Sequence, residues 1–259
     1  MRTYRRVETP PGAQVQIEWG EFPRVKLDDQ GEASLSAFII TLSHSRKSAV
    51  TWAENKKMMT WLSCHNRSYK ILGGIAPVHR IDNVKKALAS GVGPWGIIHP
   101  IYRSYARAMR FHVDACLPRT PEAKGKVEAK VRLLRRLTRM TTRSFSNLEE
   151  LQACTDECLE VWEKRTICPA TGKTVQESWE QEVSYLQPLP MNLPDPFHLS
   201  VTREVKRDCT VSFEGRQYSV PFPLAGRMVD VRRTAQKVQI LYQDQLIQKN
   251  TPGIPWSAS

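Results

Sequence analysis

The chain has 259 residues, 41% hydrophobic and 25% charged, which is the composition of a globular protein with one large domain or two modest ones. Lysine and arginine number 38 against 26 aspartates and glutamates, so the formal net charge is +12 and the pI is near 9.6. No apolar run approaches the roughly 20 residues of a membrane span, and the basic residues at the start precede no apolar segment. The sequence therefore excludes a membrane span and a secretory signal, and its charge favours a polyanionic partner, most often nucleic acid.

The first part of the chain predicts three strands in succession. Alternating apolar and polar residues indicate a strand over residues 14–22, with Glu18 at its centre. A nearly continuous apolar run over residues 34–45 is typical of a strand that is buried on both faces. Turn-forming residues at 29–31 separate these two strands, and a third strand is predicted over residues 48–54.

Helices and strands alternate in the next segment. The predicted helix over residues 55–74 ends at two glycines, and the predicted strand over residues 76–83 carries Asp82 near its end. The segment continues with two helices, a strand and a long basic helix, predicted at residues 83–91, 99–111, 112–120 and 124–140. Three successive strands followed by alternating strands and helices predict a mixed sheet flanked by helices, over residues 13–145.

The composition changes in the last third of the chain. Residues 146–186 are predicted to be helical, and four prolines make residues 187–198 a stiff linker. Short alternating strands follow, with a hairpin around Glu214 and Gly215, so residues 199–250 are predicted to form a small all-β barrel. The terminal segments are predicted as tails, at residues 1–12 and 251–259.

Three acidic residues are candidates for catalysis because they lie at the centre or end of predicted elements: Glu18, Asp82 and Glu128. Each also has an ordinary structural interpretation. Glu18 is then an outward residue of a half-exposed strand, and Asp82 is a helix cap. Glu128 is then the partner of Arg132, one helical turn later. Glu21, three residues after Glu18, is predicted to point to the opposite face of the strand.

The surroundings of Glu128 strengthen the catalytic interpretation. Residues 119–143 hold nine basic residues and two acids, a net +7 of the chain's +12. Basic residues share one predicted helix face with Glu128, at positions Lys124, Arg132, Arg135 and Arg139. A neighbouring apolar stripe, predicted to pack on the sheet, consists of Val127, Val131 and Leu134. An acid within a phosphate-binding face repels the ligand unless a metal ion lies between them, and paired divalent ions held by carboxylates are common in phosphoryl transfer.

Four stretches resemble a known family when taken in order. They read "PPGAQVQIEWGEF", "RIDNVKKAL", "CLPRTPEAKGKVEAKVRLLRR" and "VSFEGRQYSVP". Together they resemble a bacterial insertion-sequence transposase of the IstA type, which belongs to the DDE recombinases of the retroviral-integrase superfamily. The resemblance runs from about Pro10 to about Gln248. It implies an RNase H-like catalytic core followed by a small barrel similar to the one that follows the core in Mu-type transposases.

The resemblance also implies a role for each acid. Asp82 matches the family's second aspartate, and Glu128 matches its glutamate. Glu18 stands where the family has its first aspartate, so the side chain here is longer by one methylene. The three carboxylates would hold two Mg²⁺ ions, for which Mn²⁺ can substitute. The implied reaction is attack of water, and then of a DNA 3′-hydroxyl, on a phosphodiester.

Further expectations concern binding. The residues expected to contact DNA phosphates are Lys85, Lys124, Lys126, Arg132, Arg135 and Arg136. The resemblance implies that the chain binds element ends and target DNA as a homo-oligomer. It also implies a separate ATPase helper protein, and this chain has no glycine-rich phosphate loop of its own. Family members usually begin with a helix-turn-helix region, whereas the predicted core here begins within about a dozen residues of Met1, so this region is expected to be absent.

Two alternatives to a transposase remain open. The longer side chain of Glu18 and the missing helix-turn-helix region are also compatible with a non-catalytic DNA-binding relative that acts passively or as a regulator. A metal-dependent nuclease on the same fold would cut DNA without joining ends. Six scattered cysteines without a CxxC pair predict reduced thiols in the cytoplasm. Cys154 and Cys158 are four residues apart, but buried thiols are commoner than a zinc site without nearby histidine.

Overall fold

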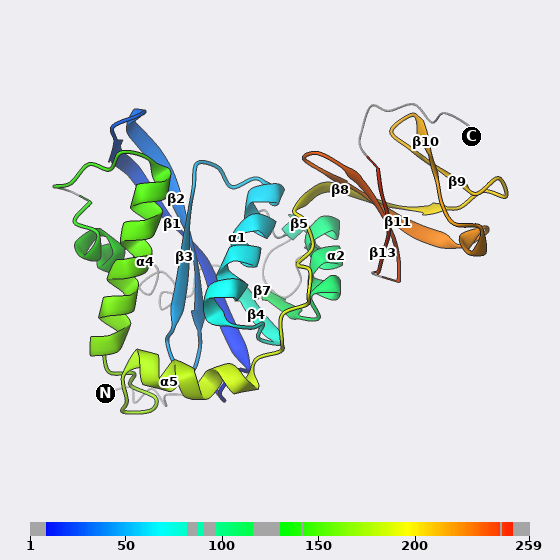
Figure 1. Ribbon diagram of the computed structural model, residues 1–259. Helices are drawn as coiled ribbons and strands as arrows, with labels where there is room; N and C mark the ends of the chain where they lie inside the picture. Colours follow the sequence, from blue (N-terminus) through cyan, green and yellow to red (C-terminus); the bar gives the residue numbers. More distant parts are fainter. Residues whose placement is uncertain are drawn as a thin grey trace. The chain divides into compact units, whose positions relative to one another are not determined.

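A five-stranded mixed sheet organises the larger part of the protein, as the computed structural model shows (Figure 1). The structure describes residues 9–81, 88–90, 97–115, 130–140, 142–243 and 245–250. The strands lie in the order β3-β2-β1-β4-β7. Their bounds are β1 (Gln14–Leu27), β2 (Gly31–Leu42), β3 (Ser48–Ala53), β4 (Val78–Ile81) and β7 (His112–Ala115). The first three strands are antiparallel, whereas β4 and β7 run parallel to β1, so the mixed sheet predicted from the sequence is confirmed.

β1 and β2 form a hairpin that is longer than predicted. The predicted strand over residues 14–22 continues to Leu27, after an irregularity in pairing between Phe22 and Val25. Pro23 lies at this irregularity, where its lack of an N–H leaves no ladder bond to lose. The tip of the hairpin is held by a hydrogen bond of 2.8 Å from the Asp28 N–H to the carbonyl of Phe145. Val25, Leu27 and Leu35 near the tip are buried, so the hydrophobic core extends along the whole hairpin.

Helices cover both faces of the sheet, which Figure 1 shows nearly edge-on. α1 (Met58–Leu72) and α2 (Pro100–Ala108) lie on one face, where Trp61 and Tyr102 pack among buried aromatic rings. The helical residues 130–137 and α4 (Leu148–Arg165) lie on the other face. Their Leu134 and Leu151 join one hydrophobic core with β1, β2 and β3.

Two predicted helical segments differ from the structure. Residues 83–91 were predicted as one helix, but β5 (Leu88–Ser90) is a strand paired with β6 (Ile97–Ile98). A cross-strand partner with two β-branched residues outweighs a local helical pattern. Residues 146–186 are not helical throughout, because a non-helical connection at residues 166–174 separates two helices and contains Pro169, which cannot continue a helix. The second is α5 (Val175–Glu182), which begins with a capping box between Thr174 and Glu177 and continues into a short 3-10 turn, η2 (Val183–Tyr185).

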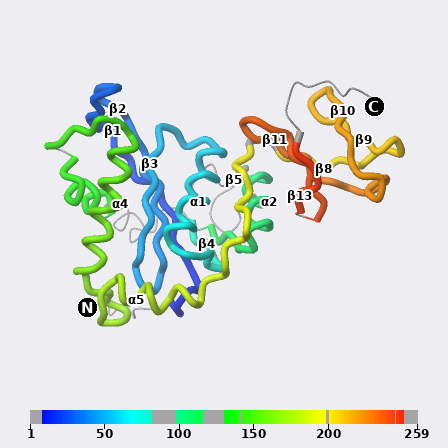
Figure 2. The backbone as a smooth tube through the Cα atoms, in the orientation of Figure 1, coloured from blue at the N-terminus to red at the C-terminus, as the bar shows by residue number. Residues whose placement is uncertain are grey.

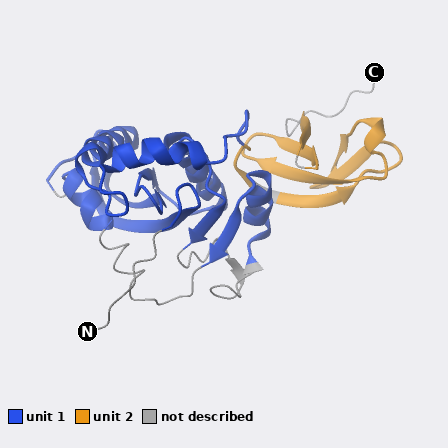
Figure 3. Cartoon of the chain, turned by 90° about the horizontal axis from the view of Figure 1, so that it is seen from below, with its two compact units in different colours: residues 1–193 blue, residues 194–259 orange. Residues whose placement is uncertain are grey.

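The chain divides into two compact units, residues 1–193 and 194–259, drawn in blue and orange in Figure 3. The second unit, yellow to red in Figure 2, consists of strands and one short 3-10 turn in its described residues. Its main sheet has the order β13-β12-β11-β8. The bounds of these strands are β8 (Phe197–Glu204), β11 (Met228–Thr234), β12 (Val238–Tyr242) and β13 (Gln245–Asn250).

A hairpin completes the second unit. It consists of β9 (Thr210–Phe213) and β10 (Arg216–Ser219), and a short 3-10 turn, η3 (Phe222–Leu224), follows. Glu214 and Gly215 connect the two strands with φ angles of 48° and 73°, the left-handed conformation of a two-residue hairpin turn. Residues of both sheets share one core that includes Val211, Phe213 and Val231. Among the described residues of the whole chain, no helix is both long and apolar enough to cross a membrane.

Candidate active site

Glu18 lies in the middle of β1, on the face of the sheet opposite the aromatic cluster. It is half-buried and pairs in register with Ile39 of β2. The next residue, Trp19, points the other way, where its ring centroid lies 5.4 Å from that of Phe38 and 5.9 Å from that of Trp61. Alternation along the strand therefore turns Glu18 toward the face that carries residues 130–137.

Close packing of this helix on β1 depends on Gly20. A Cβ atom built on Gly20 would lie 2.8 Å from Cγ2 of Val131, so a side chain there would push the helix away. Leu134, one turn further on, is buried in the core. The packing of Val131 and Leu134 on the sheet agrees with the apolar stripe predicted from the sequence. Both residues place the helix on the same face of β1 as Glu18.

The outer face of this helix is basic. Arg132, Arg135 and Arg136 are exposed, and Arg139 at the end of the helix is exposed as well. The guanidinium carbon of Arg135 lies 5.5 Å from the centroid of the Phe22 ring, an arrangement that orients the side chain along the helix–sheet boundary. Three of the six residues expected to bind DNA therefore present their charges to solvent. The other three, Lys85, Lys124 and Lys126, lie outside the described residues.

Two of the three candidate carboxylates, Asp82 and Glu128, also lie outside the described residues. Their nearest described neighbours in the chain are Ile81 and Lys130. Ile81 of β4 pairs with Ile17 of β1 in parallel register. In the sequence, Glu18 directly follows Ile17 and Asp82 directly follows Ile81. Within the described part of the chain, no three His, Cys, Asp or Glu residues are grouped as a metal site would require.

A polar row crosses the sheet beside Glu18. Gln16, Arg80 and Asp114 are in register on β1, β4 and β7, so their side chains share one face. Nε of Arg80 lies 3.4 Å from Oδ2 of Asp114, and both side chains are well exposed. The sequence alone does not predict this row, because the register of parallel strands cannot be read from either strand by itself.

Lys130 differs from the other basic residues of its helix because its ammonium points inward. The Nζ atom donates a hydrogen bond of 2.8 Å to Oγ of Ser48 on β3 and lies 5.7 Å from the centroid of the Trp162 ring. Burial lowers the pKa of this lysine, while the carboxylates of Glu18 and Glu163 act to raise it. Its position one turn before the buried Leu134 is the sequence signal that could have distinguished Lys130 from the exposed basic residues.

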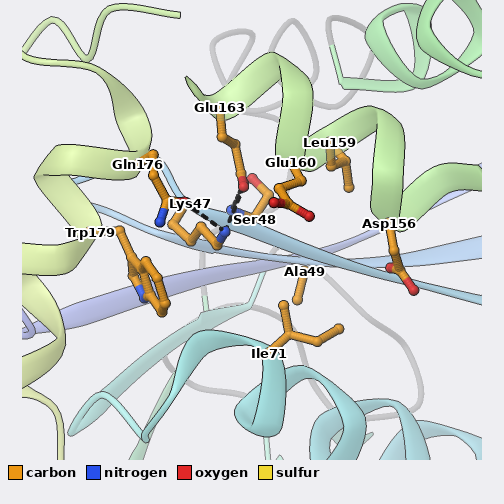
Figure 4. A pocket seen from close by; sticks show the side chains of 10 residues that line it. All are labelled: Lys47, Ser48, Ala49, Ile71, Asp156, Leu159, Glu160, Glu163, Gln176 and Trp179. Carbon is orange, nitrogen blue, oxygen red and sulfur yellow. Dashed lines mark hydrogen bonds and ion pairs between the residues drawn. The ribbon is translucent and has the colours of Figure 1, made fainter. Parts of the chain in front are cut away.

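Glu163 of α4 bonds both to Ser48, the partner of Lys130, and to Lys47, a buried lysine. One carboxylate oxygen accepts the Ser48 N–H at 3.1 Å, and the other lies 2.6 Å from Nζ of Lys47. Burial raises the pKa of Glu163, and the charge of Lys47 opposes that shift. Figure 4 shows Glu163 pointing from α4 toward both residues, at a cavity of about 370 Å³ that Trp179 also lines. The otherwise unpaired edge of β3 is thus bonded to α4 side chains.

Glu21 is not part of this face. Its carboxylate forms an ion pair with Lys56, whose ammonium lies 5.5 Å from the centroid of the Trp19 ring. It also accepts a hydrogen bond of 3.2 Å from Ser36. Glu21 therefore lies on the Trp19 side of the strand, as the alternation predicts.

The cysteines of the described residues are free thiols. Cys158 donates to the carbonyl of Leu137 at 3.3 Å, and burial, reinforced by Cys154, raises the pKa of its thiol. Cys154 instead accepts a contact of 3.6 Å from the guanidinium of Arg143. Both thiols serve packing between α4 and the segment that precedes it.

Comparison with known proteins identifies relatives of both units. A family model for the Mu transposase C-terminal domain matches residues 189–249. The transposase for insertion sequence element IS232 of Bacillus thuringiensis subsp. berliner is 27% identical over 247 residues, which are 93% of this chain and 56% of that protein. The transposase for insertion sequence element IS21 of Pseudomonas aeruginosa is 28% identical over 229 residues, 88% of this chain and 57% of that protein. The chain spans about half the length of these curated relatives.

A solved structure supports the fold. A chain of the simian T-cell lymphotropic virus intasome, determined in complex with PP2A regulatory subunit B56 gamma, superposes with a TM-score of 0.52. The match covers 96% of this chain and 82% of that one, at 13% sequence identity. The strand order β3-β2-β1-β4-β7, with two parallel strands added to an antiparallel meander, is that of an RNase H-like core. Over most of its length the chain is thus similar to insertion-sequence transposases, and residues 189–249 match the Mu transposase C-terminal domain.

Proposed function

We propose that the chain is the DNA-cleaving and DNA-joining part of a transposase. The observation that carries the proposal is the position of Glu18, a half-buried carboxylate at the middle of β1. It faces the side of the sheet where residues 130–137 present exposed arginines. A carboxylate beside a phosphate-binding surface suits metal-dependent phosphoryl transfer.

The proposed catalytic set is Glu18, Asp82 and Glu128. Chain connectivity supports it, because Asp82 follows Ile81, the partner of Ile17, and Glu128 precedes Lys130 by two residues. Carboxylate oxygens are the donors that Mg²⁺ and Mn²⁺ prefer, so these side chains fit two such ions. When bound, the ions activate the attacking oxygen and stabilise the leaving one.

The proposed DNA-binding residues are Lys85, Lys124, Lys126, Arg132, Arg135 and Arg136. Exposed arginines on the outer face of residues 130–137 support this assignment, as does the net charge of +12. Contacts of this kind bind the phosphate backbone without reading bases, so affinity should fall steeply with salt. The arginines beside Glu18 would seat the strand whose phosphodiester is attacked.

The proposal includes a domain division and partners. Its segments are a catalytic core, a helical segment, a linker and a small β-barrel, at residues 13–145, 146–186, 187–198 and 199–250. The partners are the ends of the insertion sequence, its target DNA, further copies of this chain bound to DNA, and a separate ATPase helper. The free thiols of the described residues agree with a reducing cytoplasm.

The test is strand transfer on pre-nicked DNA that carries the inverted repeats of the element, with Mg²⁺ or Mn²⁺. We expect the unaltered chain to join ends, and Asp82→Asn and Glu128→Gln to lose joining. Glu18→Asp is expected to join faster, by up to about 10²-fold, because displacements of about 1 Å at a reacting centre can have that effect. Joining that survives Asp82→Asn and Glu128→Gln would contradict the proposal.

Glu18 itself favours a second candidate function, a DNA-binding relative without catalysis. Its longer side chain displaces the carboxylate from the place an aspartate would give it. If only Glu18→Asp joins ends while the unaltered chain binds DNA, this second function is the correct one. A metal-dependent nuclease, the third alternative, would release cut DNA without joined product in the same assay.

A further inference from the structure

The helical residues 130–137 hold one basic side chain that does not face solvent. Arg132 and Arg136 are exposed, whereas Lys130 is half-buried and its ammonium turns toward the sheet. Withdrawing an ammonium from water is unfavourable, and an apolar side chain could fill the same space without that cost. Packing alone therefore does not explain why a positive charge lies at this position.

The contacts of Lys130 connect three elements. Its Nζ atom reaches Oγ of Ser48 on β3 at 2.8 Å and lies 5.7 Å from the Trp162 ring on α4. Ser48 is itself held, because its N–H donates to Glu163 at 3.1 Å and its hydroxyl lies 2.9 Å from that of Thr41. Lys130 is thus attached to a residue of the edge strand β3 that is itself hydrogen-bonded to α4 and β2.

The same ammonium is also part of the charge environment of Glu18. Both side chains occupy one face of the sheet, and Ser48, Thr41 and Gln16 form a row across β3, β2 and β1 in register. Glu18 is the next residue after Gln16 on that face. Arg46 adds a further positive charge near Lys130, and Glu163 a negative one.

We propose that Lys130 is a positioning residue of the proposed active site: its ammonium anchors the start of residues 130–137 on Ser48 and supplies a fixed positive charge beside Glu18. The inference rests on the proposed function. Lys130 follows Glu128 by two residues in the sequence, and Glu128 itself lies outside the described residues. No contact of Lys130 with substrate is involved.

A neutral side chain at position 130 should change two measured quantities in opposite directions. These are the rate of joining and the affinity for a divalent cation. Loss of the anchor should slow joining, because residues 130–137 are then held less firmly on β3. Loss of the positive charge should strengthen binding of a divalent cation, because Glu18 then lacks a competing charge. A residue that only stabilises the fold would weaken both properties together or change neither.

The experiment compares Lys130→Met, Lys130→Arg and Ser48→Ala with the matched control Lys164→Met. Lys164 is an exposed lysine on α4 that pairs with Glu160, one turn away. Mn²⁺ binding is measured by calorimetry on the full chain without DNA, turnover by strand transfer, and the folded fraction by thermal unfolding.

We expect Lys130→Met to bind Mn²⁺ about threefold to tenfold more tightly, as removal of a nearby like charge requires. Its turnover should fall by about tenfold, a loss within the range that small misplacements cause. Lys130→Arg should restore the Mn²⁺ affinity of the unaltered chain and part of its turnover. Ser48→Ala should keep that Mn²⁺ affinity and lower turnover, and Lys164→Met should match the unaltered chain.

The outcomes separate this inference from the proposed function. If the unaltered chain binds Mn²⁺ and joins DNA while Lys130→Met behaves as Lys164→Met does, only the positioning role of Lys130 is overturned. Mn²⁺ affinity that falls in Lys130→Met in proportion to the folded fraction also overturns it. If the unaltered chain neither binds Mn²⁺ nor joins ends, the proposed function fails and the role of Lys130 fails with it.

Discussion

The two faces of the mixed sheet use buried polar groups in different ways. On the face of Trp19, histidines and tyrosines are enclosed among aromatic rings and form hydrogen bonds with one another. On the face of Glu18, carboxylates and lysines meet at the boundary between core and solvent. Adjacent residues of β1 thus belong to two environments, a buried aromatic cluster and a boundary where charges lie close to the proposed DNA-binding surface.

The aromatic face keeps its histidines neutral. Nδ1 of His65 lies 2.8 Å from the carbonyl of Trp61, which can only accept, so the ring donates there and Nε2 accepts from the Tyr102 hydroxyl at 3.0 Å. Burial lowers the pKa of His65 to about 3. Burial, together with His65, also lowers the pKa of His79 well below its usual value. His79 stacks on Phe111 at a centroid distance of 3.7 Å.

Substitution of Trp61, on the aromatic face, is expected to cause the largest loss of stability. This side chain is 1% exposed and contacts Trp19, Phe38 and His65. Trp61→Ala should lower the free energy of unfolding by about 3–5 kcal/mol, as removal of a buried aromatic ring typically does. Urea unfolding measures the change, with Met191→Ala as a control because Met191 is fully exposed. Equal effects of the two substitutions would show that the aromatic face is not the stabilising one.

Removal of the Glu18 charge should have the reverse pattern, a large loss of activity with a small change in stability. Glu18→Gln is expected to lower strand transfer by about 10²-fold or more, because a neutral amide is a poor ligand for divalent cations. Its unfolding free energy should change less than that of Trp61→Ala, since Glu18 is only half-buried. Glu21→Gln is the matched control on the opposite face, where the carboxylate pairs with Lys56. A loss of joining in the control equal to that in Glu18→Gln would refute the assignment of faces.

The two faces also differ in how far the sequence could predict them. Period-two alternation placed Glu18 and Trp19 on opposite sides of a strand, and helical spacing placed Val131 and Leu134 on the sheet. These predictions succeeded because each depends on one element. The acceptor of Lys130 is Ser48, which is 82 residues away, and no local pattern could identify it.

Non-local pairing explains the other misses. Glu163 and the Ser48 N–H that it accepts are separated by 115 residues. The Glu214–Gly215 hairpin, by contrast, was predictable because its turn conformation and both strands lie within ten residues. The polar contacts on the face of Glu18 join residues that are far apart in the sequence.

The neutral histidines predict that stability falls in mild acid. The unfolded chain binds a proton at each histidine below about pH 6.5, whereas folded His65 does so only near pH 3. Stability contributed by the neutral ring is therefore present above about pH 6.5 and is lost as the pH falls. Two such histidines give a slope of about 2.7 kcal/mol per pH unit at most.

Unfolding in urea at pH 7.5 and pH 5.5 measures this slope. The pH dependence should be about halved in His79→Leu, which removes one of the two protons taken up on unfolding. His112→Leu is the control because His112 is exposed on β7. An unfolding free energy that stays constant over this range, or a slope that His79→Leu leaves unchanged, would contradict the neutral assignment. Acid should thus weaken the aromatic face through its buried histidines.

The smallest expected effect lies at the outer arginines beside the polar face. Arg136→Ala removes an exposed charge from residues 130–137 and should weaken non-specific DNA binding modestly without changing the unfolding free energy. Each phosphate contact contributes about −0.9 to the slope of log K against log salt concentration, so this variant should lower that slope by about one. Fluorescence anisotropy with duplex DNA between 50 and 200 mM salt, about the range over which such contacts are lost, measures it. Lys164→Met should keep the full slope, because a lysine on α4 that pairs with Glu160 is not on this helix. If both variants lower the slope equally, DNA binding depends on the overall charge of the chain and not on the face that contains Glu18.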